Sequence, residues 1–168
     1  MRAYLDIETS FSGGISVIGI YRPDTGTTQL IGSGVHDLNL YTALAGVDTI
    51  VTFNGTGFDL PVIRRRLLAD LRNDFGHRDL LYVCRKRGLR GGLKVVEQTL
   101  GIARDSAGIS GYDAPRLWER YEIHADQCAL DTLLTYNYED VVNLATLEAL
   151  LDATPVVQPT ATMRRLMQ

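Results

Sequence analysis

Alternating apolar and polar positions divide the first half of the chain into short strands separated by turns. Strands are predicted at residues 3–8, 15–21, 27–31, 48–53 and 78–83. Ser12-Gly13-Gly14 and Pro23-Asp24-Thr25-Gly26 have the composition of turns and separate the first three of these strands. Strands joined by such short turns pair antiparallel, so we expect the first three to form a meander.

Apolar residues at helical spacing predict helices in the remaining segments. These segments are residues 37–45, 59–71, 93–100, 114–121 and 126–153, and the last is either one helix or two helices joined near Tyr136. Asp37 is the expected N-cap of the first helix, Asp59 opens the second with Pro61 in its first turn, and Gly101 ends the third. Since helices separate the later strands, those strands should be parallel. The sequence therefore predicts an α/β fold with a mixed five-stranded sheet flanked by helices.

The domain organisation follows from length and composition. Residues 1–153 are predicted to form one domain, because 168 residues suffice for a single core. Residues 154–168 lack periodicity and contain two prolines, which predicts a flexible tail that is loose or bound by a partner. No signal-peptide pattern and no apolar run of about 20 residues is present, so we expect a cytoplasmic protein without membrane contact. Cys84 and Cys128 have no metal-ligand spacing, and we expect both to be reduced, buried thiols.

Acidic residues at two predicted element ends suggest chemistry. Asp6 and Glu8 are two positions apart on a predicted strand, so both side chains lie on the same face. Clustered carboxylates repel one another unless a cation neutralises them, although pairing with arginines or exposure at the strand end would also suffice. Asp59 follows a strand through a glycine-containing loop and opens a helix, where the helix dipole alone also favours an acid.

A tyrosine and an aspartate in the last predicted helix form a third candidate segment. Tyr136 and Asp140 are four positions apart and therefore lie on the same helix face. The tyrosine could hold an attacking water beside a metal-bound aspartate, or it could be a half-buried residue beside a surface aspartate. Oxygen ligands of this kind suit Mg²⁺ or Mn²⁺ rather than a soft metal.

Taken together, these segments resemble the motifs of the DEDD superfamily of 3′–5′ exonucleases. The matching residues are Asp6 and Glu8 in the first motif, Asn54, Phe58 and Asp59 in the second, and Tyr136 and Asp140 in the third. A tyrosine four residues before the last aspartate is typical of the DEDDy branch. The segment 92–102, with its Leu93-Lys94 and Val96-Glu97 pairs, resembles the YprB-like group of predicted exonucleases. The resemblance extends over about residues 3–151.

The resemblance implies a ribonuclease H-like three-layer fold and a metal-dependent 3′–5′ exonuclease. Such an enzyme hydrolyses phosphodiester bonds of single-stranded DNA or RNA ends by a two-metal-ion mechanism, with two Mg²⁺ or Mn²⁺ ions. The implied metal ligands are Asp6, Glu8, Asp59 and Asp140, and the implied substrate contacts are Thr9, Asn54, Phe58 and Lys94. Tyr136 is implied to hold the attacking water.

Charge and alternative functions complete the sequence-based hypothesis. A net charge of −3 is unusual for a nucleic-acid-binding protein, but basic residues cluster at 64–66 and 85–94, either as solvated surface or as phosphate contacts. The glycine-rich stretch 108–113 is either a mobile loop near the site or a plain surface loop.

Two alternative functions remain open. They are an endonuclease on the same fold, of ribonuclease H or junction-resolving type, and a non-catalytic nucleic-acid-binding module. A protein partner could supply processivity or unwinding, and the sequence leaves DNA and RNA equally open as substrates.

Overall fold

The computed structural model describes residues 1–106 and 108–153, and its centre is a five-stranded sheet with strand order β3-β2-β1-β4-β5. The strands are β1 (Arg2–Thr9), β2 (Ile15–Arg22), β3 (Gly26–Ile31), β4 (Thr49–Thr52) and β5 (Gly76–Asp79). The pairs β1–β2 and β2–β3 are antiparallel, whereas β1–β4 and β4–β5 are parallel. The predicted mixed sheet, with its antiparallel first three strands, is thereby confirmed.

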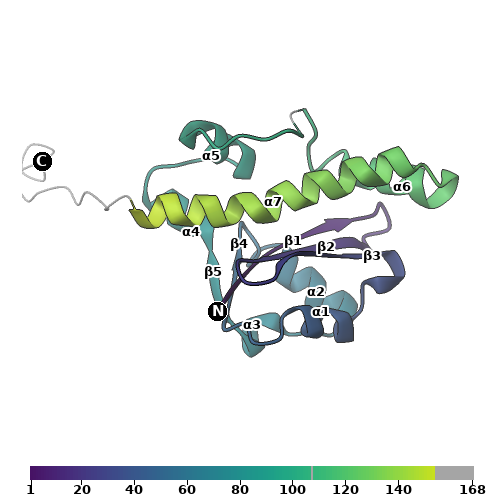
Figure 1. Cartoon of the computed structure of the whole chain (residues 1–168), viewed down its shortest axis with the longest axis horizontal. Coiled ribbons are helices and arrows are strands. Elements are labelled where there is room, and N and C mark those ends of the chain that lie inside the picture. Colours follow the sequence, from purple (N-terminus) through teal and green to yellow (C-terminus); the bar gives the residue numbers. More distant parts are fainter. Residues whose placement is uncertain (107, 154–168) are drawn as a thin grey trace, which may run out of the picture.

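Helices cover both faces of this sheet. They are α1 (Asp37–Ala43), α2 (Asp59–Leu67), α3 (Leu71–Asp74), α4 (Leu80–Lys86), α5 (Leu93–Leu100), α6 (Ala114–His124) and α7 (Gln127–Ala153), with a 3₁₀ turn at Gly32–Gly34. Figure 1 shows α7 crossing one face of the sheet, with α6 beside it and α5 on the side of α7 that faces away from the sheet. The same view places α1, α2 and α3 on the opposite face. The chain therefore forms three layers.

The two faces of β1 belong to different layers of the core. Ala3, Leu5 and Ile7 are buried in the cluster that includes residues of α1, α2 and α3. Tyr4 belongs instead to the cluster that includes Leu144 and Leu147 of α7. Because successive strand residues point to opposite faces, Asp6 and Glu8 lie on the same side as Tyr4, toward α7. The strand period thus places two carboxylates beneath the long helix.

The predicted strand at residues 78–83 is wrong. β5 ends at Asp79, and the apolar residues that follow begin α4. Leu80, Leu81 and Cys84 are buried while Tyr82 is exposed, which is the spacing of one helix face. The Asp79 carboxylate caps α4 by accepting a hydrogen bond from the backbone nitrogen of Leu81 at 3.1 Å.

Two helix boundaries also differ from the prediction. α2 ends at Leu67, because Leu68 adopts the left-handed conformation with φ of 58°, and the segment predicted as one helix to residue 71 continues as the separate α3. The N-cap of α1 is His36, whose Nδ1 accepts a hydrogen bond from the backbone nitrogen of Asn39 at 3.3 Å, whereas Asp37 is the first residue inside the helix. Gly101 ends α5 in the left-handed region, as predicted.

The C-terminal helices settle two further expectations. α7 is one continuous helix of 27 residues, and α6 extends to His124, three residues beyond the predicted end. The predicted tail at 154–168 lies outside the described residues. Cys84 is buried as expected, but Cys128 is exposed because it lies in the first turn of α7 on the side away from the core.

Within the described residues, no helix combines the length and the apolar character that crossing a membrane requires.

Candidate metal centre

Three carboxylates from two distant segments meet between the sheet and α7. Asp6 and Glu8 of β1 and Asp140 of α7 each offer an oxygen, and these oxygens all lie within 4.8 Å of one another. Glu8 and Asp140 are buried, and Asp6 is half-buried. Oxygen donors at this separation, in a largely buried position, fit a hard divalent cation such as Mg²⁺ or Mn²⁺.

Asp59 enters the same cleft from the other side of β1. It is the first residue of α2 and is only 3% exposed. Its Oδ1 accepts a hydrogen bond from the backbone nitrogen of Ile7 at 3.0 Å, which fixes the carboxylate beside the strand that carries Asp6 and Glu8. The second oxygen remains available for a cation, so Asp59 can complete a four-carboxylate set.

A cavity of about 250 Å³ contains all four acids. Its lining consists of Asp6, Ile7, Glu8, Thr9, Phe53, Asn54, Phe58, Asp59, Gly111, Tyr136 and Asp140. The structure therefore brings together the predicted metal ligands, the predicted tyrosine and three of the predicted substrate contacts. The fourth, Lys94, lines a second cavity that shares Asp6, Tyr136 and Asp140 with the first. Gly111 and Ser110 of the glycine-rich stretch reach the same place, so this stretch lies at the candidate site.

Two of the predicted substrate contacts present their side chains to solvent at the rim. Phe58 is 45% exposed, which is unusual for a phenylalanine and leaves its ring free to stack on a base. Asn54 is exposed and has a positive φ of 65°, a conformation that asparagine tolerates better than most residues. The Asn54 backbone nitrogen donates to Asp79 Oδ1 at 2.8 Å, which ties the rim loop to the cap of α4.

Burial and mutual repulsion disfavour the ionised forms of these acids when no cation is bound. Desolvation, followed by the charges of Asp140 and Asp59, raises the pKa values of Asp6 and Glu8 well above their usual range. Burial also raises the pKa of Asp59 to about 7 and raises that of Asp140. A divalent cation would displace these protons, so the cleft is poised to exchange protons for metal.

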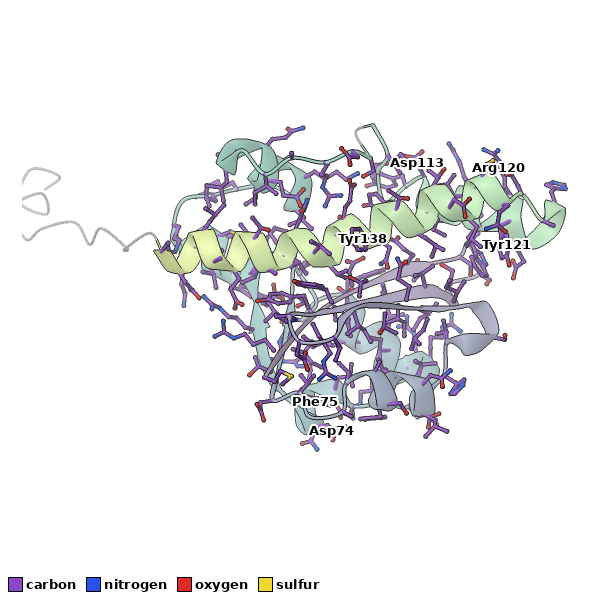
Figure 2. All side chains as sticks on the ribbon, viewed as in Figure 1. Asp74, Phe75, Asp113, Arg120, Tyr121 and Tyr138 are labelled. Carbon is purple, nitrogen blue, oxygen red and sulfur yellow. The ribbon has the colours of Figure 1, made fainter. Side chains whose placement is uncertain are left out.

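Tyr136 lies under a lysine at the edge of the cluster. It is buried, and the Lys94 Nζ lies 4.3 Å from its ring centroid. Desolvation and the neighbouring carboxylates raise the pKa of the phenol, so it stays protonated and acts as a hydrogen-bond donor. Tyr138, which Figure 2 labels on α7, is 47% exposed. Of these two tyrosines of α7, Tyr136 is therefore the one that faces the cleft.

A buried arginine that the sequence hypothesis missed holds Asp140. The Arg104 Nη2 donates to Oδ1 of Asp140 and to Oε1 of Glu97, the latter at 2.9 Å, and the Nε donates to Glu97 Oε2. Glu97 is 1% exposed and the Arg104 side chain 9% exposed. Arg104 lies in a loop without periodicity, so nothing in its surroundings in the sequence indicated this role.

Asn137 holds Asp6 in a comparable way. Its Nδ2 donates to Asp6 Oδ2 at 3.2 Å, and its Oδ1 accepts from Gln29 Nε2 at 3.0 Å. The approach of Asn137 requires a glycine on β2, because a Cβ at Gly19 would lie 2.3 Å from Asn137 Oδ1. The sequence hypothesis assigned no role to Asn137, although it lies between the two predicted residues of the third motif.

Glu139 fixes the loop that carries Arg104. Its carboxylate accepts hydrogen bonds from the backbone nitrogens of Asp105 and Ser106, and from the Ser106 hydroxyl. Two consecutive residues of α7 therefore have linked roles: Asp140 is a candidate metal ligand, and Glu139 holds the loop whose Arg104 bonds Asp140.

Comparison with known proteins places the chain in a family. The family model of the RNase H superfamily matches residues 3–152, and the chain therefore belongs to the RNase H superfamily. Among solved structures, a family B DNA polymerase from the hyperthermophilic archaeon Pyrobaculum calidifontis has the same fold, with a TM-score of 0.68 and 18% sequence identity. The match covers 89% of this chain and 24% of the polymerase chain, so this chain spans about a quarter of that protein's length. No curated protein matches the sequence significantly.

Proposed function

We propose that this protein is a metal-dependent 3′–5′ exonuclease that hydrolyses phosphodiester bonds at single-stranded DNA or RNA ends. The observation that carries the proposal is the meeting of Asp6, Glu8 and Asp140 within 4.8 Å. Asp59 and Tyr136 line the same cavity. Membership of the RNase H superfamily supports nuclease chemistry in general. The tyrosine four residues before Asp140, with its resemblance to the DEDDy pattern, favours exonucleolytic cleavage.

The four acids would hold two Mg²⁺ or Mn²⁺ ions, which supply a metal-bound water as nucleophile and stabilise the leaving oxygen. The chain's own contribution is to fix the ligands before metal arrives. Asn137 orients Asp6, the Ile7 backbone nitrogen orients Asp59, and Arg104 orients Asp140. Each of these acids has one oxygen engaged by the protein and one left for a cation, so the ligand geometry is set in advance.

Tyr136 has the properties of a group that orients water. Its phenol remains protonated in the cleft and can donate a hydrogen bond to the attacking water or to a phosphate oxygen. The backbone of Gly111 lies close to this hydroxyl, since a Cβ built on Gly111 would be 3.9 Å from it. A bulkier residue at 111 would therefore crowd the position at which we expect the water.

The rim would receive the terminal nucleotide. Phe58 would stack on the base or sugar, Asn54 and Thr9 would contact the sugar, and Lys94 would contact the backbone of the strand. An exposed ring beside a cleft of this size suits an unpaired end, because an unpaired terminal base is free to leave the strand's own stack and pack on the ring.

The proposal is tested with 5′-labelled and 3′-labelled strands of DNA and RNA, single and double, incubated with Mg²⁺ or Mn²⁺. We expect 5′-labelled single strands to shorten one nucleotide at a time, and an Asp6→Asn variant to be inactive. Glu122→Gln, which removes one exposed carboxylate on α6, is the matched control and should cleave normally. Internal fragments would assign the protein to the endonucleases, and unchanged cleavage by Asp6→Asn would show that the site is elsewhere.

A further inference from the structure

A second cavity lies beside the acidic cleft. It has a volume of about 250 Å³ and is lined by Lys94 and Gln98 of α5 and by Arg104 and Ser106 of the following loop, among others. Lys94 also lines the cavity that contains Asp6 and Asp140, and Arg104 is bonded to Asp140. The second cavity therefore adjoins the candidate metal centre and is separated from it by two cationic side chains.

Both of these cations carry a nitrogen without a hydrogen-bond acceptor. Lys94 Nζ and Arg104 Nη1 are buried, and neither has a hydrogen-bond partner among the described residues, although Lys94 Nζ lies over the Tyr136 ring. Within the described part of the chain, Ser16 Oγ is the one other buried side-chain nitrogen or oxygen in this state. Buried cationic donors are costly to leave unpaired, so two of them along one cavity indicate an acceptor that comes from outside the protein.

Glu97 also lines this cavity, but neither it nor another described acid bonds these two nitrogens. Both carboxylate oxygens of Glu97 already accept hydrogen bonds from Arg104, and the Ser106 hydroxyl is bonded to Glu139. What remains available is one ammonium group and one edge of a guanidinium group, which together suit an anion with several oxygens. Phosphate has this form, and arginine and lysine are its usual partners.

We propose that this cavity is a second phosphate subsite, which binds the strand phosphate next to the scissile one on its 5′ side. The identification of the ligand as a strand phosphate rests on the proposed function, because a nucleic-acid end bound in the acidic cleft would present its next phosphate to the neighbouring cavity. Free inorganic phosphate has the same chemistry and is the other possible source. The subsite would bind the strand without contacting the reacting bond.

A matched pair of variants on α5 separates this subsite from the metal centre. Gln98→Glu places a negative charge in the cavity, whereas Thr99→Glu places the same charge one residue further along the helix, where it does not line the cavity. Both residues are exposed, so neither change should disturb folding. Neither residue lines the two cavities that contain Asp6 and Asp140.

The binding test measures the affinity for a 5′-labelled single-stranded pentanucleotide by fluorescence anisotropy, with Ca²⁺ in place of the catalytic ion. We expect Gln98→Glu to bind the natural strand about tenfold more weakly than Thr99→Glu and the wild type. An uncharged methylphosphonate at the proposed linkage should weaken binding about tenfold in the wild type but little in Gln98→Glu. A methylphosphonate one linkage further from the 3′ end should have little effect in any of the three proteins. Equal binding by both variants, with no effect of the first methylphosphonate, would overturn the subsite.

Two further measurements distinguish the possible failures. Calorimetric titration with inorganic phosphate in the presence of Mg²⁺ tests whether the cavity binds free phosphate. If Gln98→Glu weakens this binding while the methylphosphonate has no effect on strand binding, the cavity binds free phosphate and the proposal that it binds a strand phosphate is overturned. Hydrolysis of a nucleoside p-nitrophenyl phosphodiester, which has one phosphate, tests the proposed function alone. If the wild type cleaves this substrate while the strand and phosphate measurements show no difference between the variants, the subsite fails and the proposed function stands.

Discussion

Replacing Asp59 by asparagine should stabilise the metal-free protein, and the gain should depend on pH in a defined direction. The substitution keeps the oxygen that accepts from the Ile7 backbone nitrogen and removes a buried charge. Burial raises the pKa of Asp59 from an ordinary 3.8 to about 7, so the folded protein resists ionisation of this group. Each unit of pKa difference between the folded and unfolded states is worth about 1.36 kcal/mol. The shift from 3.8 to about 7 therefore means that an ionised Asp59 lowers the free energy of unfolding by about 4 kcal/mol at most.

The direction of the pH effect follows from proton linkage. Between pH 3.8 and about 7 the folded protein holds a proton on Asp59 that the unfolded chain has released. The free energy of unfolding therefore falls as the pH rises through this range, and it no longer changes on this account above pH 7. The variant lacks this dependence, so its advantage should be close to zero near pH 4 and should reach about 2–4 kcal/mol at pH 7.5.

The assay is urea unfolding in the presence of a chelator at pH 4.5, 6.0 and 7.5, with the exposed Glu122→Gln as the control for loss of one carboxylate. Added Mn²⁺ should reverse the order of stability, because the wild type gains more binding free energy from the ion than the variant does. A variant that is less stable than the wild type at pH 7.5 without metal, or whose advantage is the same at all three pH values, would refute the reasoning.

Three other substitutions test the groups that hold the cluster. Arg104→Met leaves two buried carboxylates without their guanidinium partner and should lower the free energy of unfolding of the metal-free protein by about 3–5 kcal/mol, measured by urea denaturation; a change below about 1 kcal/mol would show that the ion pairs contribute little. Tyr136→Phe should reduce kcat on a single strand about 100-fold or more while leaving Mn²⁺ affinity, measured by calorimetry, unchanged; unchanged kcat would remove the tyrosine from the reaction. Gly19→Ala should displace Asn137 from Asp6 and weaken Mn²⁺ binding, because the added carbon would lie 2.3 Å from the Asn137 amide oxygen; wild-type affinity would exclude this positioning role.

Local patterns in the sequence were sufficient for most of the fold. Alternation along residues 3–8 gives the strand and also predicts that Asp6 and Glu8 share a face, which the register of β1 confirms. The error at residues 78–83 has a definite cause. The apolar run that begins at Leu80 fits a buried strand and a short helix equally well, and the capping of α4 by Asp79, a local hydrogen bond that the strand prediction did not consider, favours the helix.

The sequence indicated the acids of the site but not the residues that hold them. Asp6 and Asp140 are 134 positions apart, and only the resemblance to a family pattern linked them before the structure placed them together. Arg104 contacts Glu97 and Asp140 across 7 and 36 residues respectively, and no periodicity or spacing connects these positions. Contacts of this kind depend on how the loop after α5 folds back onto α7, which local propensity does not encode.

The charges around the cluster explain how an acidic protein could bind a phosphate strand. Five carboxylates, Asp6, Glu8, Asp59, Glu97 and Asp140, lie within a network that contains two cations, Lys94 and Arg104. If all five acids were ionised the network would carry −3, one divalent ion would leave −1, and two ions would give +1. With all five acids ionised, the network becomes positive only when both ions are present, because Arg104 and Lys94 alone do not balance five carboxylates. In the metal-free protein the raised pKa values of the four cleft acids favour retained protons, which make the charge less negative than −3. Metal binding replaces the retained protons and, with two ions, leaves the network at +1, which attracts phosphate, so the overall charge of −3 is no obstacle to a nucleic-acid substrate.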